Sequence, residues 1–133
     1  MRVVLDTNVL ISAIFFAGIP ARILAAWSKG RFEMLASVDI LSEYRRVVAR
    51  LERRFPSVEA QPVLDLVIRE CHLVEPVSVP ETACDDPDDL KFLGCALAGR
   101  ASCIVSGDHA LVRASGFERL EVVTPTAFAR RYL

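Results

Sequence analysis

The sequence has no apolar run long enough to cross a membrane. Its first apolar stretch, residues 3–16, is interrupted by Asp6 and three other polar residues, far short of the roughly 18 uncharged residues of a membrane helix. A signal peptide would need basic residues, an apolar stretch and a cleavage site, and Arg2 alone does not supply this pattern. We therefore expect a soluble, cytoplasmic protein without a membrane partner.

Zinc ligands and paired thiols are also scarce. The two histidines, His72 and His109, lie far apart, and no two of the four cysteines are spaced as C-x-x-C. Cysteine often behaves as a small buried hydrophobe, which suits the apolar neighbours of Cys95 and Cys103. The pattern indicates reduced structural cysteines rather than a thiolate metal site or a redox pair.

Net charge is small, but the two signs are unevenly placed. The formal net charge is −1, yet residues 1–54 contain nine basic and five acidic side chains, and residues 55–133 contain seven and twelve. A near-neutral chain of this kind gives no sign of bulk nucleic-acid binding, although it leaves room for a local basic patch.

One such patch is the arginine-rich segment 45–54. Arg45, Arg46 and Arg50 are candidates for contacts with RNA phosphates or with an acidic segment of a protein partner. The alternative is that they form only the solvated face of an amphipathic helix at residues 38–54, whose apolar side chains share one stripe.

Short apolar strands alternate with helical segments along the whole chain. We expect one domain, residues 1–133, with strands at 2–6, 32–37, 72–77, 102–108 and 120–125. Helices are expected at 7–16, 20–28, 38–54, 55–71 and 87–99, and from Pro125 onward. This alternation predicts an α/β fold with a parallel sheet covered on both faces, without determining the strand order.

Four carboxylates from separate parts of the chain are predicted to meet at one edge of that sheet. Asp6 ends the first strand, and Asp108 follows the fourth. Glu43 lies early on the helix after the second strand, and Asp89 lies in the first turn of the helix near Pro87. In open α/β sheets, ligands bind beyond the carboxyl ends of the strands, which is where these residues converge.

Carboxylates this close together repel one another unless a cation neutralises them. Mg²⁺ and Mn²⁺ prefer such hard oxygen ligands, and no cluster of His or Cys competes for the site. One or two of these ions can hold a phosphodiester, activate a water molecule and stabilise the leaving oxygen. The acids therefore favour the chemistry of a metal-dependent nuclease.

Each acid also has a structural interpretation. Asp86, before Pro87, is a good helix N-cap, and Asp89 could complete a capping pair with it. Asp88 could be merely solvated, and Glu43 could be a polar residue between apolar neighbours. A phosphatase with Asp6 as nucleophile is a weaker alternative. Such families usually have a second acid two residues after the nucleophile, where this sequence has Asn8, and a Gly-rich phosphate loop, which it lacks.

Five motifs together resemble the PIN-domain family, in the expected order and over nearly the whole chain. They are "VVLDTNVLISA", "ILSEYRRVV", "DDPDDLKFLGCALAG", "IVSGDHAL" and "VVTPTAFARRYL". The chain looks most like the small prokaryotic PIN toxins of toxin–antitoxin pairs. This resemblance implies a three-layer α/β/α sandwich with a central parallel sheet. It also implies Mg²⁺- or Mn²⁺-dependent cleavage of RNA, a cognate antitoxin and a homodimer.

The resemblance also assigns roles to single residues. The four acids that match the family's catalytic and metal-binding positions are Asp6, Glu43, Asp89 and Asp108. Asn8 and Ser106 match polar positions that support the first and last acids.

Two points remain open. Relatives often have a further acid where Leu90 stands, and a register with Asp88 as ligand, or a contribution from Asp86, is an alternative. A PIN-like binding or regulatory module without nuclease activity is the alternative function.

Overall fold

The strands of the computed structural model, which describes residues 1–133, form one sheet of five parallel strands. The strand order is β3-β2-β1-β4-β5, so β1 lies at the centre. The strands are β1 (Arg2–Leu5), β2 (Glu33–Ala36), β3 (His72–Leu73), β4 (Cys103–Val105) and β5 (Glu121–Val123). The expected parallel sheet is thus confirmed.

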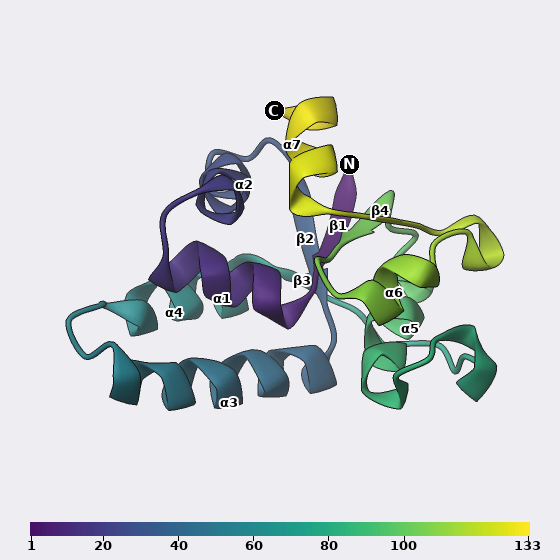
Figure 1. Cartoon of the computed structure of the whole chain (residues 1–133), viewed down its shortest axis with the longest axis horizontal. Helices are drawn as coiled ribbons and strands as arrows, with labels where there is room; N and C mark the ends of the chain where they lie inside the picture. Colours follow the sequence, from purple (N-terminus) through teal and green to yellow (C-terminus); the bar gives the residue numbers. More distant parts are fainter.

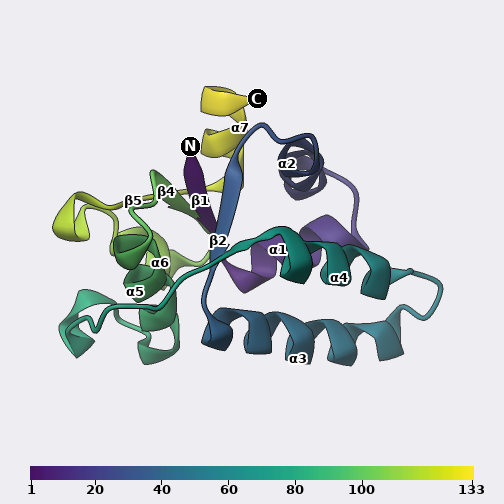
Figure 2. The ribbon, with the colours of Figure 1, turned by 180° about the vertical axis from the view of Figure 1, so that it is seen from behind.

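Seven α-helices surround the sheet and make the outer layers of an α/β/α fold. They are α1 (Thr7–Phe15), α2 (Ile19–Ser28), α3 (Val38–Arg54), α4 (Ala60–Glu70), α5 (Leu90–Ala98), α6 (His109–Arg113) and α7 (Pro125–Tyr132). In both ribbon views, α1 to α4 lie on one side of the strands and α5 and α6 on the other (Figures 1 and 2). The expected three-layer fold is therefore confirmed.

Burial on both faces explains why the central strands are continuous apolar runs. Val3, Val4 and Leu5 of β1 are fully buried, as are all three residues of β4. Such runs are typical of parallel strands that helices cover on both sides. Phe15 and Trp27 are buried in the same core, so the apolar helices near the N-terminus serve packing.

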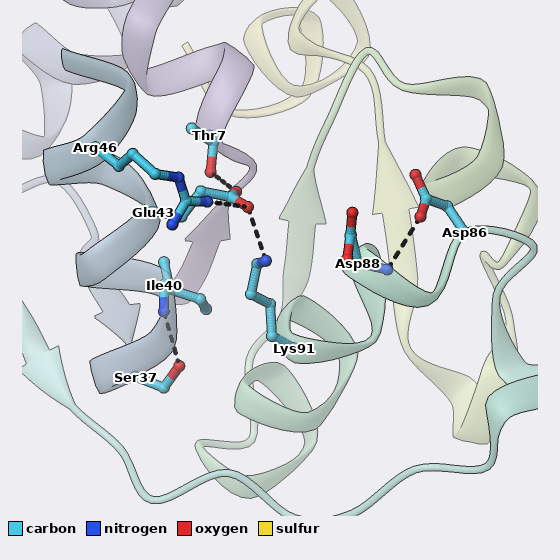
Figure 3. A network of polar contacts seen from close by, with 8 residues as sticks. All are labelled: Thr7, Ser37, Ile40, Glu43, Arg46, Asp86, Asp88 and Lys91. Atoms are coloured by element: carbon cyan, nitrogen blue, oxygen red, sulfur yellow. Dashed lines mark hydrogen bonds and ion pairs between the residues drawn. The ribbon is translucent and has the colours of Figure 1, made fainter. Parts of the chain in front are cut away.

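The long helix α3 has the predicted bounds because its ends are well marked. The Ser37 hydroxyl caps its N-terminus by accepting a hydrogen bond from the backbone N–H of Ile40, 3.3 Å away (Figure 3). Its buried side chains are Ile40, Tyr44 and Val48, members of the predicted apolar stripe.

Several local features differ from the expectation. The helix predicted at 55–71 spans only Ala60–Glu70, and the strands predicted at 102–108 and 120–125 span only Cys103–Val105 and Glu121–Val123. The strand predicted at 72–77 is only His72–Leu73, because its neighbour β2 ends at Ala36, the residue that pairs with Leu73. The helix predicted from Pro87 begins as a 3₁₀ turn, Pro87–Asp89 (η2), and becomes α-helical at Leu90. The short helix α6 after β4 was not predicted.

No single helix is long and apolar enough to cross a membrane. Only the consecutive helices α1 and α2, bent by 92° at their junction, reach that length and composition, and they do so jointly.

Tyr44 connects α3 to the end of the central strand, β1, through a hydrogen bond. Its side chain is fully buried, and its hydroxyl donates a hydrogen bond to the backbone carbonyl of Leu5. Leu5 immediately precedes Asp6, and Tyr44 immediately follows Glu43. This hydrogen bond therefore helps to fix the position of Glu43 relative to Asp6.

Replacement Tyr44→Phe should lower the free energy of unfolding by about 1–3 kcal/mol, because it leaves a buried carbonyl without its partner. The matched control is Tyr132→Phe, since Tyr132 is only half-buried near the C-terminus and its ring packs on Phe128. Urea unfolding followed by circular dichroism measures both. Equal stability of the two variants would contradict the anchoring role of Tyr44.

Candidate metal centre

The carboxyl ends of β1 and β4 lie side by side. Leu5 pairs with Val105 in the parallel register, and the backbone N–H of Asp6 donates to the Val105 carbonyl at 3.0 Å. Each chain then leaves the sheet, through Asp6 into α1 and through residues 106–108 into α6. Asp6 and Asp108 thus meet at the edge of the sheet that the sequence predicted.

Ser106 connects the first acid with the loop of the last. The Ser106 hydroxyl is fully buried and donates to Oδ2 of Asp6 at 2.6 Å. The same hydroxyl oxygen accepts a hydrogen bond from the backbone N–H of Asp108 at 3.0 Å. The Asp6 carboxylate, only 4% exposed, is therefore held in one orientation.

Asp89 supplies a buried carboxylate oxygen that has no partner. The residue is 7% exposed, stands at the junction of η2 and α5, and leaves its Oδ2 without any hydrogen bond. Asp86, Asp89 and Asp108 each place one carboxylate oxygen within 4.8 Å of the others. A buried carboxylate with an unpartnered oxygen, close to two further carboxylates, has the chemistry of a site for a hard divalent cation.

The other two members of this cluster are fixed by the backbone. Oδ1 of Asp108 caps α6 by accepting from the N–H of Ala110 at 2.8 Å. Oδ1 of Asp86 caps η2 by accepting from the N–H of Asp88 at 3.0 Å (Figure 3). Asp86 therefore has the predicted capping position and also lies in the acidic cluster.

The electrostatics of these carboxyls reflect their crowding. Burial, followed by the charges of Asp108 and Asp6, raises the pKa of Asp89 to about 7. Burial also raises the pKa of Asp6, assisted by the charges of Asp108 and Glu43 and opposed by the Ser106 hydrogen bond. Ionising both groups is costly without a cation. A cation that binds here would stabilise the deprotonated form of both carboxyls.

Glu43 lies apart from the three-acid cluster and has cationic partners of its own. Its Oε2 accepts a hydrogen bond from the Thr7 hydroxyl, while its Oε1 lies 2.7 Å from Nζ of Lys91 (Figure 3). The guanidinium of Arg46 is 3.7 Å from the same Oε1. Partial burial tends to raise the pKa of Glu43, but the bonds from Lys91 and Thr7 outweigh it and lower the pKa.

The remaining candidates make fewer contacts. Asn8 is exposed on α1 and its side chain makes no hydrogen bond, so Ser106 is the side chain that supports Asp6. Asp88 is exposed. Leu90 packs partly buried against the core, which suits an apolar side chain at this position.

The arginines of α3 are exposed. Arg45 and Arg50 make no ion pair, and Arg46 has only its long contact with Glu43. Sequence reasoning missed Thr7 and Lys91 as partners of Glu43. The sequence shows that Lys91 is the first base after six acids at residues 75–89, which marks it as a base near the acidic edge but does not identify Glu43 as its partner.

Comparisons with known proteins agree with this geometry. A family model described as PIN domain matches residues 2–110. VapBC2 from Rickettsia felis, in a crystal structure bound to a DNA fragment from its promoter, contains a chain with the same fold at a TM-score of 0.64. The two chains are 17% identical, and the match covers 93% of this chain and 98% of the other. A search of curated proteins gives no sequence match.

The raised pKa of Asp89 predicts how stability depends on pH in the presence of a chelator. Between pH 3.8 and about 7, the folded protein keeps a proton that the unfolded chain has lost. Its free energy of unfolding should therefore fall as pH rises through this range, by at most about 1.4 kcal/mol per pH unit from this group.

Asp89→Asn should remove this component, so the stability difference between the variant and the unmodified protein should shift steadily from pH 4.5 to 7. Asp88→Asn, at the exposed neighbour, is the control and should leave the slope unchanged. Denaturant unfolding at four pH values measures both. A pH-independent difference for Asp89→Asn would show that this carboxyl is not perturbed.

Proposed function

Because the chain belongs to the PIN-domain family, we propose that it is a Mg²⁺- or Mn²⁺-dependent endoribonuclease that hydrolyses RNA phosphodiester bonds. The observation that carries this proposal is the buried carboxylate of Asp89, which has an unpartnered Oδ2 and lies close to the carboxylates of Asp86 and Asp108. No basic side chain pairs with any of these three oxygens, so a bound divalent cation would supply the missing positive charge.

The proposed catalytic and metal-binding residues are Asp6, Glu43, Asp89 and Asp108. A divalent cation bound there would lower the pKa of a water molecule and stabilise charge on the leaving oxygen. Asp89 offers its free oxygen, and Asp108 is held for the same task by the N-terminus of α6. Asp6 is oriented by Ser106, and Glu43 by Thr7.

The exposed arginines of α3 support RNA as the substrate class. Arg45, Arg46 and Arg50 follow Glu43 on the same helix, and Arg46 lies 3.7 Å from the Glu43 carboxylate. Phosphates of a bound strand could be held there while one phosphodiester faces the acids. An acidic segment of a protein partner could use the same arginines.

We further propose that the chain is the toxin of a toxin–antitoxin pair, restrained by a cognate antitoxin and acting as a homodimer of single domains. The fold shared with a chain of VapBC2 over nearly the full length of both chains supports this proposal. A PIN-like binding or regulatory module remains the second candidate. It is favoured by the Lys91–Glu43 ion pair, which neutralises one of the four acids without any metal.

Purified protein should cleave single-stranded RNA when Mn²⁺ is added, and a chelator should stop the cleavage. Asp6→Asn should reduce the rate by at least about 100-fold, more than the loss of a residue that only supports a metal ligand. Asp65→Asn is the matched control, because Asp65 is exposed on α4 and makes no contact with the site. A fluorescent RNA substrate resolved on gels measures all three.

Undiminished cleavage by Asp6→Asn, in preparations freed of contaminating nuclease, would contradict the catalytic assignment. Isothermal titration that detects no binding of Mg²⁺ or Mn²⁺ at millimolar concentration would favour the binding module.

Expression of the chain alone should arrest bacterial growth if it is a toxin, whereas expression of Asp6→Asn should not. Co-expression of the protein encoded by the adjacent reading frame should restore growth by forming a complex. Colony counts and co-purification measure the two effects. Unimpaired growth of cells that contain active nuclease would contradict the toxin role and leave the proposed nuclease activity standing.

A further inference from the structure

Lys91 is the one lysine at the acidic edge, and it is paired with a single acid. Its Nζ lies 2.7 Å from Oε1 of Glu43, and its side chain is 21% exposed. Figure 3 shows it reaching from the start of α5 across to α3. Because Asp89 lies two residues earlier, the same turn of chain carries the unpartnered carboxylate oxygen and the ammonium that neutralises Glu43.

Both oxygens of Glu43 are engaged, unlike those of Asp89. Oε2 accepts the Thr7 hydroxyl, and Oε1 faces Lys91 at close range and Arg46 at 3.7 Å. Arg46 is 69% exposed, so solvent screens its charge, whereas the Glu43 and Lys91 side chains are only 18% and 21% exposed. Lys91 is therefore the partner that dominates the charge at Glu43.

A divalent cation and this ammonium cannot both contact Oε1. A metal ion would lie about 2.1 Å from a carboxylate oxygen that it binds. The ammonium of Lys91 lies 2.7 Å from the same oxygen, so the two positive charges would be close neighbours. Coulomb repulsion at such separations is large in a partly buried site. Glu43 can therefore bind either Lys91 or the cation through this oxygen.

We propose that Lys91 is a positioning residue that competes with the divalent cation for Glu43 and is released when the cation binds. This inference rests on the proposed metal-dependent function. In the metal-free protein, Lys91 holds Glu43 in place and neutralises it. The affinity for metal is then lower than the acids alone would give, since part of the binding free energy is spent in breaking the ion pair.

The test is Mn²⁺ titration calorimetry at neutral pH and constant ionic strength, with circular dichroism to verify folding. Lys91→Met keeps most of the aliphatic side chain and removes the charge. This variant should bind Mn²⁺ about fivefold more tightly, because an ion pair worth about 1 kcal/mol no longer has to be broken. Lys91→Arg keeps the competing cation and should retain the original affinity. Arg46→Gln, which removes a screened charge from the same oxygen, should also have little effect.

A second background separates competition from a general charge effect. In Glu43→Gln the ion pair is absent, so adding Lys91→Met should give no further gain in affinity. An equal gain in both backgrounds would mean that Lys91 merely repels the cation at a distance, and would overturn the proposal. Lys91→Gln replaces Lys91→Met if the methionine variant does not fold.

The release itself can be measured because the chain has only two lysines, Lys29 and Lys91. Lys29 is exposed at the end of α2 and provides an internal reference. Acetylation by acetic anhydride, read by mass spectrometry, should increase at Lys91 relative to Lys29 when Mg²⁺ replaces chelator. The increase should be lost in Glu43→Gln.

The outcomes distinguish this inference from the proposed function. Equal Mn²⁺ affinity of Lys91→Met and the unmodified protein would overturn the competition and leave the metal site intact. Absence of Mn²⁺ binding in both would overturn the metal site and the competition together. Unchanged labelling of Lys91 on addition of Mg²⁺ would contradict its release.

Discussion

The repulsion among buried carboxylates at the carboxyl edge of β1 and β4 is the constraint on which the site depends. Folding brings Asp89 and Asp108 together with Asp86, close enough to Asp6 for their charges to interact, and leaves one oxygen of Asp89 without a partner. Burial, and after it the charges of neighbouring acids, raises the pKa of both Asp6 and Asp89. A bound cation would relieve the cost of ionising these carboxyls, and a hard divalent ion fits the oxygen donors of the proposed site.

The scaffold maintains this crowding with a few specific bonds. Ser106 binds the Asp6 carboxylate and the backbone of Asp108, so the ends of two adjacent strands are joined through one hydroxyl. Tyr44 joins α3 to the end of β1 and thereby places Glu43 beside Thr7. Burial of these polar groups in low dielectric makes each bond costly to break, which keeps the carboxylates from moving apart.

Local patterns in the sequence were sufficient to predict most of the elements and the edge where Asp6 and Asp108 meet. The bounds of α3 follow from the Ser37 cap and the apolar stripe, and the convergence of Asp6 and Asp108 follows from the geometry of parallel strands. The partners of Glu43 could not be predicted in this way. Lys91 reaches Glu43 from 48 residues away, and such a pairing depends on how α3 and α5 sit across the sheet. Strand order, the short β3 and the exposed position of Asn8 likewise depend on tertiary packing.

Anomalous diffraction from crystals soaked in Mn²⁺ tests the central claim most directly. The account predicts a peak within bonding distance of Oδ2 of Asp89 and of the Asp108 carboxylate. It further predicts that Nζ of Lys91 moves away from Oε1 of Glu43 wherever the ion contacts that oxygen. Crystals that hold Mn²⁺ only at other surfaces, with the Asp89 oxygen still unpartnered, would contradict the claim that these acids form a metal centre.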